Sequence, residues 1–186
     1  MFGRYGQAKA RHADARLEAY EAAREDAIAN HGLGPVLRLA DIDGSALDAW
    51  RHTWAGRRHE TGTGGWNWPE LLRNRPRRAA VLPLAIWYGA DLCGLALGHA
   101  SRHRAAGVRH TVTLTHAERR PEPPDVPLRG RIIPLAVAVA RNYGLALGAT
   151  RLRLAYPDPN LLWYYEALGF DVARQGGKPV YCEQEI

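Results

Sequence analysis

Helical and alternating patterns of apolar residues divide the chain into predicted helices and strands. Residues from about Gln7 to Asn30 are rich in Ala, Glu and Arg and lack Pro and Gly, which predicts a helix. Its large apolar residues are few, so we expect a narrow apolar stripe that packs on the edge of its own domain or on a partner. Gly32, Gly34 and Pro35 predict the end of this helix.

The next segment combines one strand with two short helices. Val36 to Ala40 alternates as a strand does, and Asp43-Gly44-Ser45 predicts a turn and an N-cap for a helix over Ala46 to Trp54. A stretch rich in Gly, Thr and Arg, from Gly56 to Gly65, predicts a loop, and a short helix follows near Glu70 to Asn74.

The middle of the chain predicts a meander of three strands. Two apolar runs, Val81 to Tyr88 and Leu92 to Ala100, are separated by Gly89-Ala90-Asp91, which predicts a hairpin. Val108 to Thr115 alternates Val, Thr and Leu and predicts the third strand.

After a Pro-rich link, the stretch from Ile132 to Leu147 predicts a helix that Gly148 caps. We expect one face of this helix to carry four residues, Leu135, Val139, Tyr143 and Ala146. Thr150 to Ala155 predicts a strand, and Asn160 to Leu168 predicts a short helix that Gly169 closes. The last two strands are predicted at Val172 and at Val180 to Cys182, with a turn at Gly176-Gly177 between them.

Strands joined both by hairpins and by helices predict an α/β layered fold with a mixed central sheet of about seven strands flanked by helices. A chain of 186 residues is long enough to bury a substantial core. We therefore divide the chain into an N-terminal helical extension, residues 1–34, and one α/β domain, residues 35–186.

Composition narrows the class of protein. The longest apolar run is far shorter than the roughly 20 residues that cross a bilayer, and no signal-peptide pattern opens the chain, so we expect a cytoplasmic protein without a membrane partner. Cys93 and Cys182 show no metal or disulfide spacing and are expected to be structural. The scattered His residues predict no metal site.

The net charge is +6, and Lys9 and Lys178 are the only lysines among 25 basic residues. One interpretation is a GC-rich genome that encodes its basic residues as Arg. The other is a surface for phosphate or nucleic acid, because a guanidinium binds phosphate through two hydrogen bonds. One local group of arginines consists of Arg73, Arg75, Arg77 and Arg78.

The predicted element order, together with the run Leu162-Trp163-Tyr164-Tyr165-Glu166-Ala167-Leu168-Gly169-Phe170, resembles the GNAT superfamily of acetyltransferases. The resemblance extends from Val36 to the C-terminus. It implies that an acetyl group passes from acetyl-CoA to an amine acceptor. It also implies that Tyr165 gives a proton to the departing thiolate, a task that suits a phenol because it stays protonated at neutral pH. The alternative is that Tyr165 is a packing aromatic with a satisfied hydroxyl.

The resemblance places the CoA pyrophosphate at the start of the helix after the fourth strand, where backbone N–H groups and the positive helix end hold phosphates. The matching residues here are Arg129, Gly130, Arg131 and Ile132. Ile132 and Pro134 stand where the family has small residues. Pro134 has no N–H to donate, and the bulky Ile132 is expected to hinder the cofactor. Further cofactor contacts are implied at Thr113, Leu114, Thr115 and Asn160.

Three accounts of this departure stay open. Arg129 and Arg131 replace missing amides with charge in an active enzyme, which is the account that we favour. Alternatively, the site accepts a different acyl donor. In the third account CoA binding is lost, and a non-catalytic module that binds nucleic acid or a protein partner remains.

Three residues are candidates for the base that takes the acceptor's proton. His116, Glu118 and Glu122 follow the strand whose far end flanks the acetyl group in the family. The alternative is that each is an ordinary loop residue.

The resemblance implies an acceptor groove between Arg51 and Arg78, where we expect contacts from Trp54, Trp66, Trp68 and Arg73. Aromatic faces beside Arg stack bases while guanidinium groups hold phosphates, so an RNA-borne amine joins proteins and small molecules as a candidate acceptor. Some small basic GNAT proteins are toxins that acetylate the amino acid on charged tRNA, which adds an antitoxin-like partner or a homodimer as a candidate assembly. The alternative is that these Trp residues pack the helices against the sheet.

Overall fold

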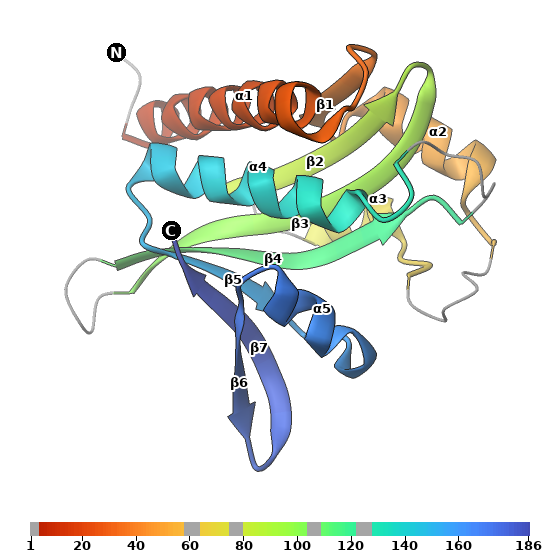
Figure 1. The fold of residues 1–186 in the computed structure, drawn as a ribbon. Helices are drawn as coiled ribbons and strands as arrows, with labels where there is room; N and C mark the ends of the chain where they lie inside the picture. Colours follow the sequence, from red (N-terminus) through yellow and green to blue (C-terminus); the bar gives the residue numbers. More distant parts are fainter. Residues whose placement is uncertain (1–3, 58–63, 75–79, 104–108, 122–127) are drawn as a thin grey trace.

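The computed structural model describes residues 4–57, 64–74, 80–103, 109–121 and 128–186, and its elements follow the predicted order (Figure 1). Residues 122–127 of the Pro-rich link, which include Glu122, and the arginines at 75, 77 and 78 lie outside the described residues. The elements are α1 (Arg4–His31), β1 (Leu37–Asp41), α2 (Gly44–Thr53), α3 (Trp68–Asn74), β2 (Val81–Tyr88), β3 (Asp91–His103), β4 (Arg109–Arg119), α4 (Ile132–Leu147), β5 (Arg151–Ala155), a 3-10 turn (Pro159–Leu161), α5 (Leu162–Ala167), β6 (Asp171–Gln175) and β7 (Lys178–Glu185).

The strands form one mixed sheet of seven strands in the order β1-β2-β3-β4-β5-β7-β6. Hairpins join β2 to β3 and β6 to β7, so these pairs are antiparallel. The pair of β1 with β2 and the pair of β5 with β7 are antiparallel as well. Only β4 and β5 pair in parallel among the described strands, because α4 connects them as a crossover. The predicted α/β architecture is therefore confirmed.

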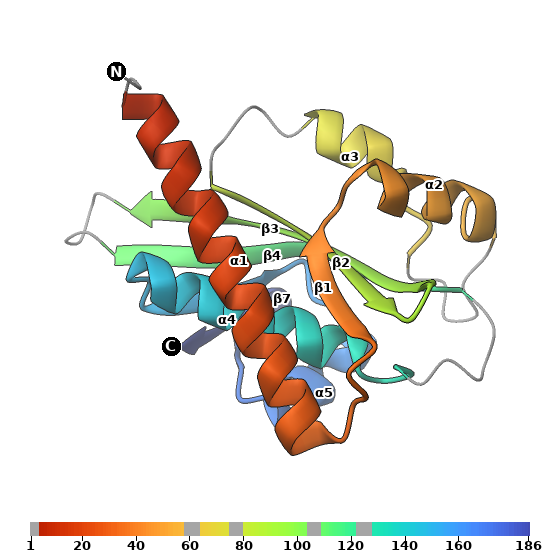
Figure 2. The same ribbon diagram turned by 90° about the horizontal axis from the view of Figure 1, so that it is seen from above.

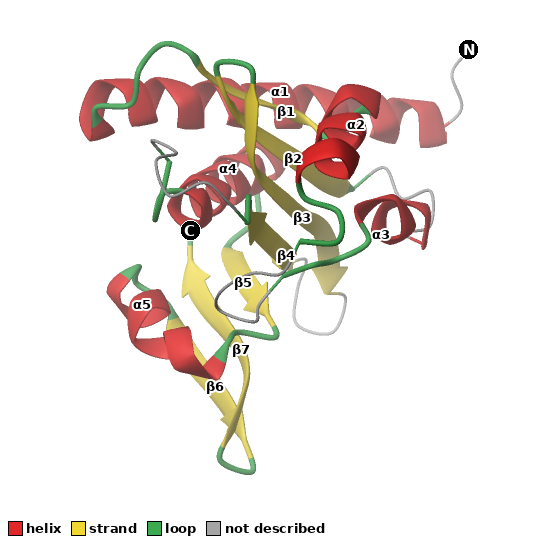
Figure 3. Ribbon diagram, turned by 90° about the vertical axis from the view of Figure 1, so that its right-hand side faces the viewer, coloured by secondary structure: helices red, strands yellow, loops and turns green. Residues whose placement is uncertain are grey.

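Helices cover both faces of the sheet (Figure 3). On one face α1, α4 and α5 enclose the larger core, whose buried residues include Leu84, Val112 and Leu152 of the sheet. On the other face α2 and α3 pack over a smaller core that includes Trp87 and Leu95. Because the central strands face a core on both sides, their sequences are continuous apolar runs rather than a strict alternation of apolar and polar residues.

Helix α1 lies on its own domain rather than projecting from it. Its buried alanines recur every fourth residue, at Ala15, Ala19, Ala23 and Ala27, and small side chains let α1 cross closely over α4 (Figure 2). Asp41 at the end of β1 anchors the helix, because it accepts hydrogen bonds from the Tyr20 hydroxyl at 2.7 Å and from Arg16 at 2.9 and 3.0 Å. Of the placements left open by the sequence, the structure supports packing within the chain.

The buried face of α4 differs from the prediction at one position. Leu135, Val139 and Tyr143 are buried as expected, but Ala146 is exposed and Leu147 is buried in its place. Leu147 follows Tyr143 by four residues and so continues the same row, whereas Ala146 falls outside it. Gly148 ends the helix in the left-handed region, with φ at 72°.

No helix within the described ranges is long and apolar enough to cross a membrane.

Candidate active site

The parallel pairing of β4 and β5 stops halfway along β4. Thr111 to Leu114 pair with Arg151 to Leu154, but β4 continues for five residues beyond Leu114 while β5 ends at Ala155. Past this point the two strands diverge, and no strand of the described residues lies beside the backbone edge of β4 that faces β5 (Figure 1). Such an edge presents N–H and C=O groups to a bound molecule.

A bulge in β4 lies where the divergence begins. Leu97 of β3 pairs with His116 and the next residue, Gly98, pairs with Leu114, so Thr115 is the extra residue. The Thr115 hydroxyl donates to the Leu97 carbonyl at 3.0 Å and lies 3.0 Å from His116 Nδ1. Bulges bend a strand and re-aim the side chains after it, which positions His116 and the residues that follow.

The structure corrects the predicted end of this strand. His116 and Glu118 were expected to follow it, but both lie within β4, which extends to Arg119. Their place in a strand fixes their backbone, so neither is a loop residue. Thr113 and Leu114 are also within β4, and the Leu114 side chain is buried in the larger core.

The start of α4 lies beside the unpaired part of β4. The Ile132 side chain packs on Gly94 of β3, where an added Cβ would come within 2.7 and 2.8 Å of Ile132 carbons, and Gly94 pairs with Arg119 at the end of β4. The Ile132 side chain is buried in the larger core. A hydrogen bond at the start of α4 runs from the Leu135 N–H to the Arg131 carbonyl. The N–H groups of Ile132 and Ile133 come before this bond, so they have no partner inside the helix.

Two arginines flank this helix start in different ways. Arg129 is exposed and makes no hydrogen bond or ion pair within the described part of the chain, whereas Arg131 donates to the His31 carbonyl at the end of α1, at 3.1 Å. Gly130 between them has φ at 75°, a conformation that glycine adopts without strain. Arg129 is thus the cation that is available to an anion here.

Tyr165 lies in α5 with its side chain mostly buried, in the same core as Leu114 and Leu154, the last paired residues of β4 and β5. Burial raises the pKa of its phenol above the ordinary value near 10, so the phenol is protonated at neutral pH. The neighbouring Tyr164 is less buried, and its ring centroid lies 6.0 Å from that of Tyr165.

The segment after β5 holds two exposed aromatic residues that were not among the predicted site residues. Tyr156 directly follows β5, is 87% exposed and has φ at 52°, which is rare for a residue with a side chain. Trp163 of α5 is also exposed. Asn160, an expected cofactor contact, is exposed in the 3-10 turn between them, where its N–H donates to Asp158 at 2.9 Å. The available signal was the position of Tyr156 in a loop directly after a strand, since binding residues often lie on loops.

Glu118 lies on the opposite face of the sheet and ties α3 to β4. It is 4% exposed, and its two carboxylate oxygens accept separate hydrogen bonds, from Gly65 N–H at 2.6 Å and from Trp68 Nε1–H at 2.5 Å. Trp66 between these residues packs edge-on against His116, with the ring centroids 5.0 Å apart. The sequence positions 65–68 and 116–118 thus form one cluster beside the divergence of β4.

The other predicted acceptor contacts differ in exposure. Trp54 and Trp68 are buried in the smaller core, which favours the packing alternative for these two rings. Trp66 is partly exposed, and Arg73 is exposed in the last turn of α3. Trp54 Nε1 is buried without a hydrogen-bond partner among the described residues. Across those residues, no group of three or more His, Cys, Asp or Glu side chains is arranged to hold a metal ion.

Comparison with known proteins gives matches in structure rather than in sequence. No protein-family model matches the chain, and no curated protein matches its sequence. A transcriptional regulator from Bacillus halodurans C-125 superposes with a TM-score of 0.57 at 16% identity, covering 76% of this chain and 97% of its own. The ribosomal-protein-S18-alanine N-acetyltransferase from Escherichia coli gives 0.54 at 17% identity, covering 81% of this chain and 94% of its own.

A third solved structure carries a ligand. It is a tyrosine-to-phenylalanine mutant of the toxin AtaT bound to acetyl-CoA and to the C-terminus of the antitoxin AtaR, with a TM-score of 0.50 at 14% identity, covering 81% of this chain and 93% of its own. At such identities the likeness is one of fold. We conclude that the chain has the fold of the GNAT acetyltransferases.

Proposed function

We propose that this protein is an N-acetyltransferase that moves an acetyl group from acetyl-CoA to an amine. The observation that carries the proposal is the divergence of β4 from β5 after Leu114, next to the start of α4, with Tyr165 buried in the same core as the last paired residues of the two strands. The AtaT structure with acetyl-CoA and the S18-alanine acetyltransferase support it as neighbours of the same fold.

In this proposal the start of α4 and the free edge of β4 hold the donor. The N–H groups of Ile132 and Ile133 and the positive end of the helix bind its phosphates, and Arg129 adds the charge that compensates for the missing N–H of Pro134. The backbone of β4 from Thr115 onward pairs with the amides of the extended arm. Asn160 and Tyr156 lie on the β5 side of the same opening.

Tyr165 acts as the acid. The amine nitrogen attacks the thioester carbonyl carbon, the carbon–sulfur bond breaks, and the departing thiolate takes the proton of the Tyr165 phenol. The phenolate then recovers a proton from solvent. Burial raises the pKa of this phenol, which keeps its proton in place at neutral pH and also makes it a weaker acid.

His116 acts as the base, and Glu118 positions it. Both Glu118 oxygens already accept hydrogen bonds, so this carboxylate holds residues 65–68 against β4 rather than removing a proton. The Thr115 hydroxyl at Nδ1 and the edge of Trp66 fix the orientation of the His116 ring. The imidazole then takes the proton that the acceptor nitrogen loses.

The acceptor approaches between Trp66, Arg73 and β4. An RNA-borne amine, a protein N-terminus and a small amine are the three classes to compare. The net charge of +6 favours a polyanionic carrier.

Calorimetry with acetyl-CoA, followed by a transfer assay that detects released thiol over these three acceptor classes, tests the proposal. Tyr165→Phe is expected to lower transfer by about 10²–10⁴-fold while acetyl-CoA affinity changes little. Tyr164→Phe is the matched control and keeps full transfer. Arg129→Ala weakens acetyl-CoA binding, whereas the exposed Arg174→Ala does not.

Two results contradict the enzyme. The first is equal transfer by wild type and Tyr165→Phe. The second is no acetyl-CoA binding together with salt-sensitive retention of RNA or DNA, which instead supports a non-catalytic binding module. If the protein is a toxin, its expression arrests growth and Tyr165→Phe relieves the arrest. Equal arrest by both proteins shows that catalysis is not the cause.

A further inference from the structure

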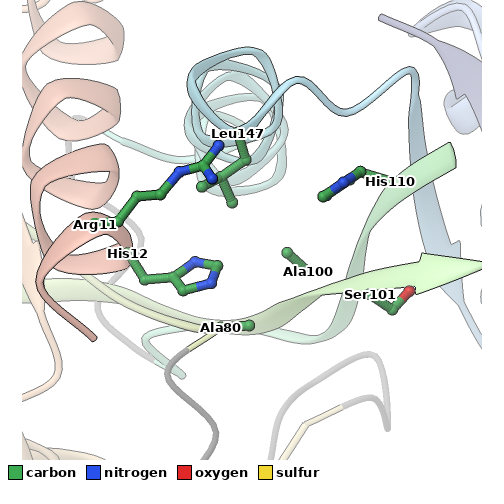
Figure 4. Close-up of a pocket in the computed structure, with 7 residues that line it drawn as sticks. All are labelled: Arg11, His12, Ala80, Ala100, Ser101, His110 and Leu147. Carbon is green, nitrogen blue, oxygen red and sulfur yellow. The ribbon is translucent and has the colours of Figure 1, made fainter. Parts of the chain in front are cut away.

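A cavity of about 240 Å³ at the last turn of α4 is lined by histidine and serine side chains that are already engaged (Figure 4). The Ser101 hydroxyl donates to the Thr111 carbonyl at 3.4 Å, and neither His12 nor His110 is without a partner. By contrast, the Tyr156 side chain at the candidate active site is 87% exposed and makes no hydrogen bond or ring contact within the described residues. Its ring is therefore open to a bound molecule.

The exposure of Tyr156 departs from the alternation of β5. Leu152 and Leu154 are buried in the larger core, and Tyr156 is the next residue in phase with them, because side chains alternate between the two faces of a strand. The left-handed backbone of Tyr156, with φ at 52°, breaks this phase, and Pro157 is buried at the following position. An aromatic ring is thus turned from the core to solvent at the point where β5 leaves the sheet.

The conformation of Tyr156 is strained, and the residues after it hold it in place. A left-handed backbone is unfavourable for most residues that have a side chain. Proline rings restrict φ at Pro157 and Pro159, and the Asp158 carboxylate accepts a hydrogen bond from Asn160 N–H at 2.9 Å. A side chain with so much exposed surface contributes little packing that offsets the strain. Strained residues that their surroundings hold in place cluster at functional sites, which points to a role in binding.

The position of Tyr156 associates it with the acceptor rather than with the adenine of the donor. Tyr156 lies two residues beyond Leu154, the last residue of β5 that pairs with β4, so it is about 7 Å along the chain from the divergence. In the proposed function the donor extends along β4 from Thr115 toward the start of α4. That helix start packs on Gly94, which pairs with Arg119, roughly 13 Å farther along β4. The phosphates and the adenine therefore lie away from Tyr156, whereas the acceptor meets the thioester end.

An exposed tyrosine ring distinguishes a planar partner from an aliphatic one. Two aromatic rings in an offset or edge-on arrangement attract each other beyond the burial of their area, which corresponds to about two- to tenfold in affinity. Trp66, on the β4 side of the opening, is a second partly exposed aromatic residue. Aromatic side chains thus occur on both the β4 side and the β5 side of the opening.

We propose that Tyr156 is a specificity-determining residue that stacks on a planar ring carried by the acceptor next to its amine. A nucleobase and the ring of an aromatic amine share this chemistry. This role rests on the proposed acetyl transfer, since it concerns the acceptor of the same site.

Two amines of similar size, phenylethylamine and cyclohexylethylamine, test this role, and an aminodeoxyadenosine is the amine that carries a nucleobase. We expect wild type to acetylate the phenyl compound with a kcat/KM about three- to tenfold above that of the cyclohexyl compound. Tyr156→Leu keeps apolar bulk without an aromatic face and is expected to bring this ratio within about twofold of one. Tyr156→Phe keeps the ratio. Leu145→Ala removes exposed apolar surface near the other end of α4 and is the control that leaves the ratio unchanged.

A structural role is separated from specificity by urea unfolding. Because the ring is exposed, Tyr156→Leu is expected to leave the unfolding midpoint unchanged while the ratio falls. Calorimetric binding of the same amines to the full chain, in the presence of CoA, adds a readout that needs no turnover. A preference for the phenyl compound that Tyr156→Leu abolishes supports the role of Tyr156 even without acetyl transfer, and in that case only the proposed reaction fails.

The remaining outcomes are equally distinct. A higher kcat/KM for the aminodeoxyadenosine than for phenylethylamine assigns the ring to a nucleobase, and the reverse order assigns it to an aromatic amine; both support the role of Tyr156. Transfer with the same ratio in wild type and Tyr156→Leu overturns that role and leaves the proposed reaction intact. A Tyr156→Leu variant that raises only the KM for acetyl-CoA overturns it as well, because the ring then contacts the donor. Binding of none of the amines near or below about 10 mM also overturns it.

Discussion

Replacing Glu118 by Ala deprives two N–H groups of their shared acceptor. A hydrogen bond to a charged group contributes about 1.5–3 kcal/mol, so two of them set an upper bound of roughly 3–6 kcal/mol. Gly65 is exposed and its N–H regains water, whereas Trp68 is fully buried and its Nε1–H does not. The loss therefore falls mainly on Trp68, and we expect Glu118→Ala to lower the free energy of unfolding by about 2–4 kcal/mol.

Glu118→Gln separates the acceptor role from the charge. Its amide oxygen still accepts from Trp68, but its NH₂ group faces the Gly65 N–H, so we expect a smaller loss of about 1–2 kcal/mol. Glu70→Ala is the control, because Glu70 is an exposed carboxylate on α3, the helix that carries Trp68. Its removal is expected to change the free energy of unfolding by at most about 0.5 kcal/mol. Urea unfolding monitored by Trp fluorescence measures all three variants.

Kinetics decide between positioning and proton transfer. If Glu118 positions residues 65–68, Glu118→Gln raises the KM for the acceptor and leaves the KM for acetyl-CoA and the pH profile unchanged. A folded Glu118→Gln that loses kcat by about 100-fold together with one limb of the pH profile would identify Glu118 as the base and refute our reasoning. Unchanged stability of Glu118→Ala would refute the buried hydrogen bond from Trp68 Nε1–H.

Three further predictions concern packing, capping and thiol reactivity. Gly94→Ala is expected to lower the free energy of unfolding, measured in urea, by about 1–3 kcal/mol because the new Cβ meets Ile132. Adding Ile132→Val is expected to restore part of the loss. Gly44→Ala is the control, because open space surrounds Gly44 and the substitution does not destabilise the protein. The Asp43 carboxylate accepts hydrogen bonds from the Ser45 hydroxyl and from Ala46 N–H, and these bonds lower its pKa. The stabilisation is therefore present above the unfolded pKa near 4 and lost at lower pH, so the stability difference between wild type and Asp43→Ala shrinks on acidification. Burial raises the pKa of the Cys93 thiol to about 11, so a thiol reagent at pH 8 is expected to label it only after unfolding; rapid labelling of the native protein contradicts this.

The amino-acid sequence determined the elements and their order. Strong local signals set the boundaries: the Ala-, Glu- and Arg-rich run of α1, the Asp43 cap of α2, the Gly89-Ala90-Asp91 turn and Gly148 at the end of α4. These signals act through neighbours within a few residues, which is why they can be read from the chain alone. The mixed sheet followed because hairpins and crossovers each permit one pairing direction.

Only the tertiary structure decided where side chains at the site point. The bulge at Thr115 extends β4 through His116 and Glu118, and nothing in the local pattern marks a bulge that a partner strand imposes. The inward turn of Ile132 depends on Gly94, 38 positions earlier in the chain. The two bonds of Glu118 likewise depend on residues 65–68. Contacts between distant segments cannot be read from local periodicity, so the arrangement of the side chains at the site, unlike the order of the strands, required the folded chain.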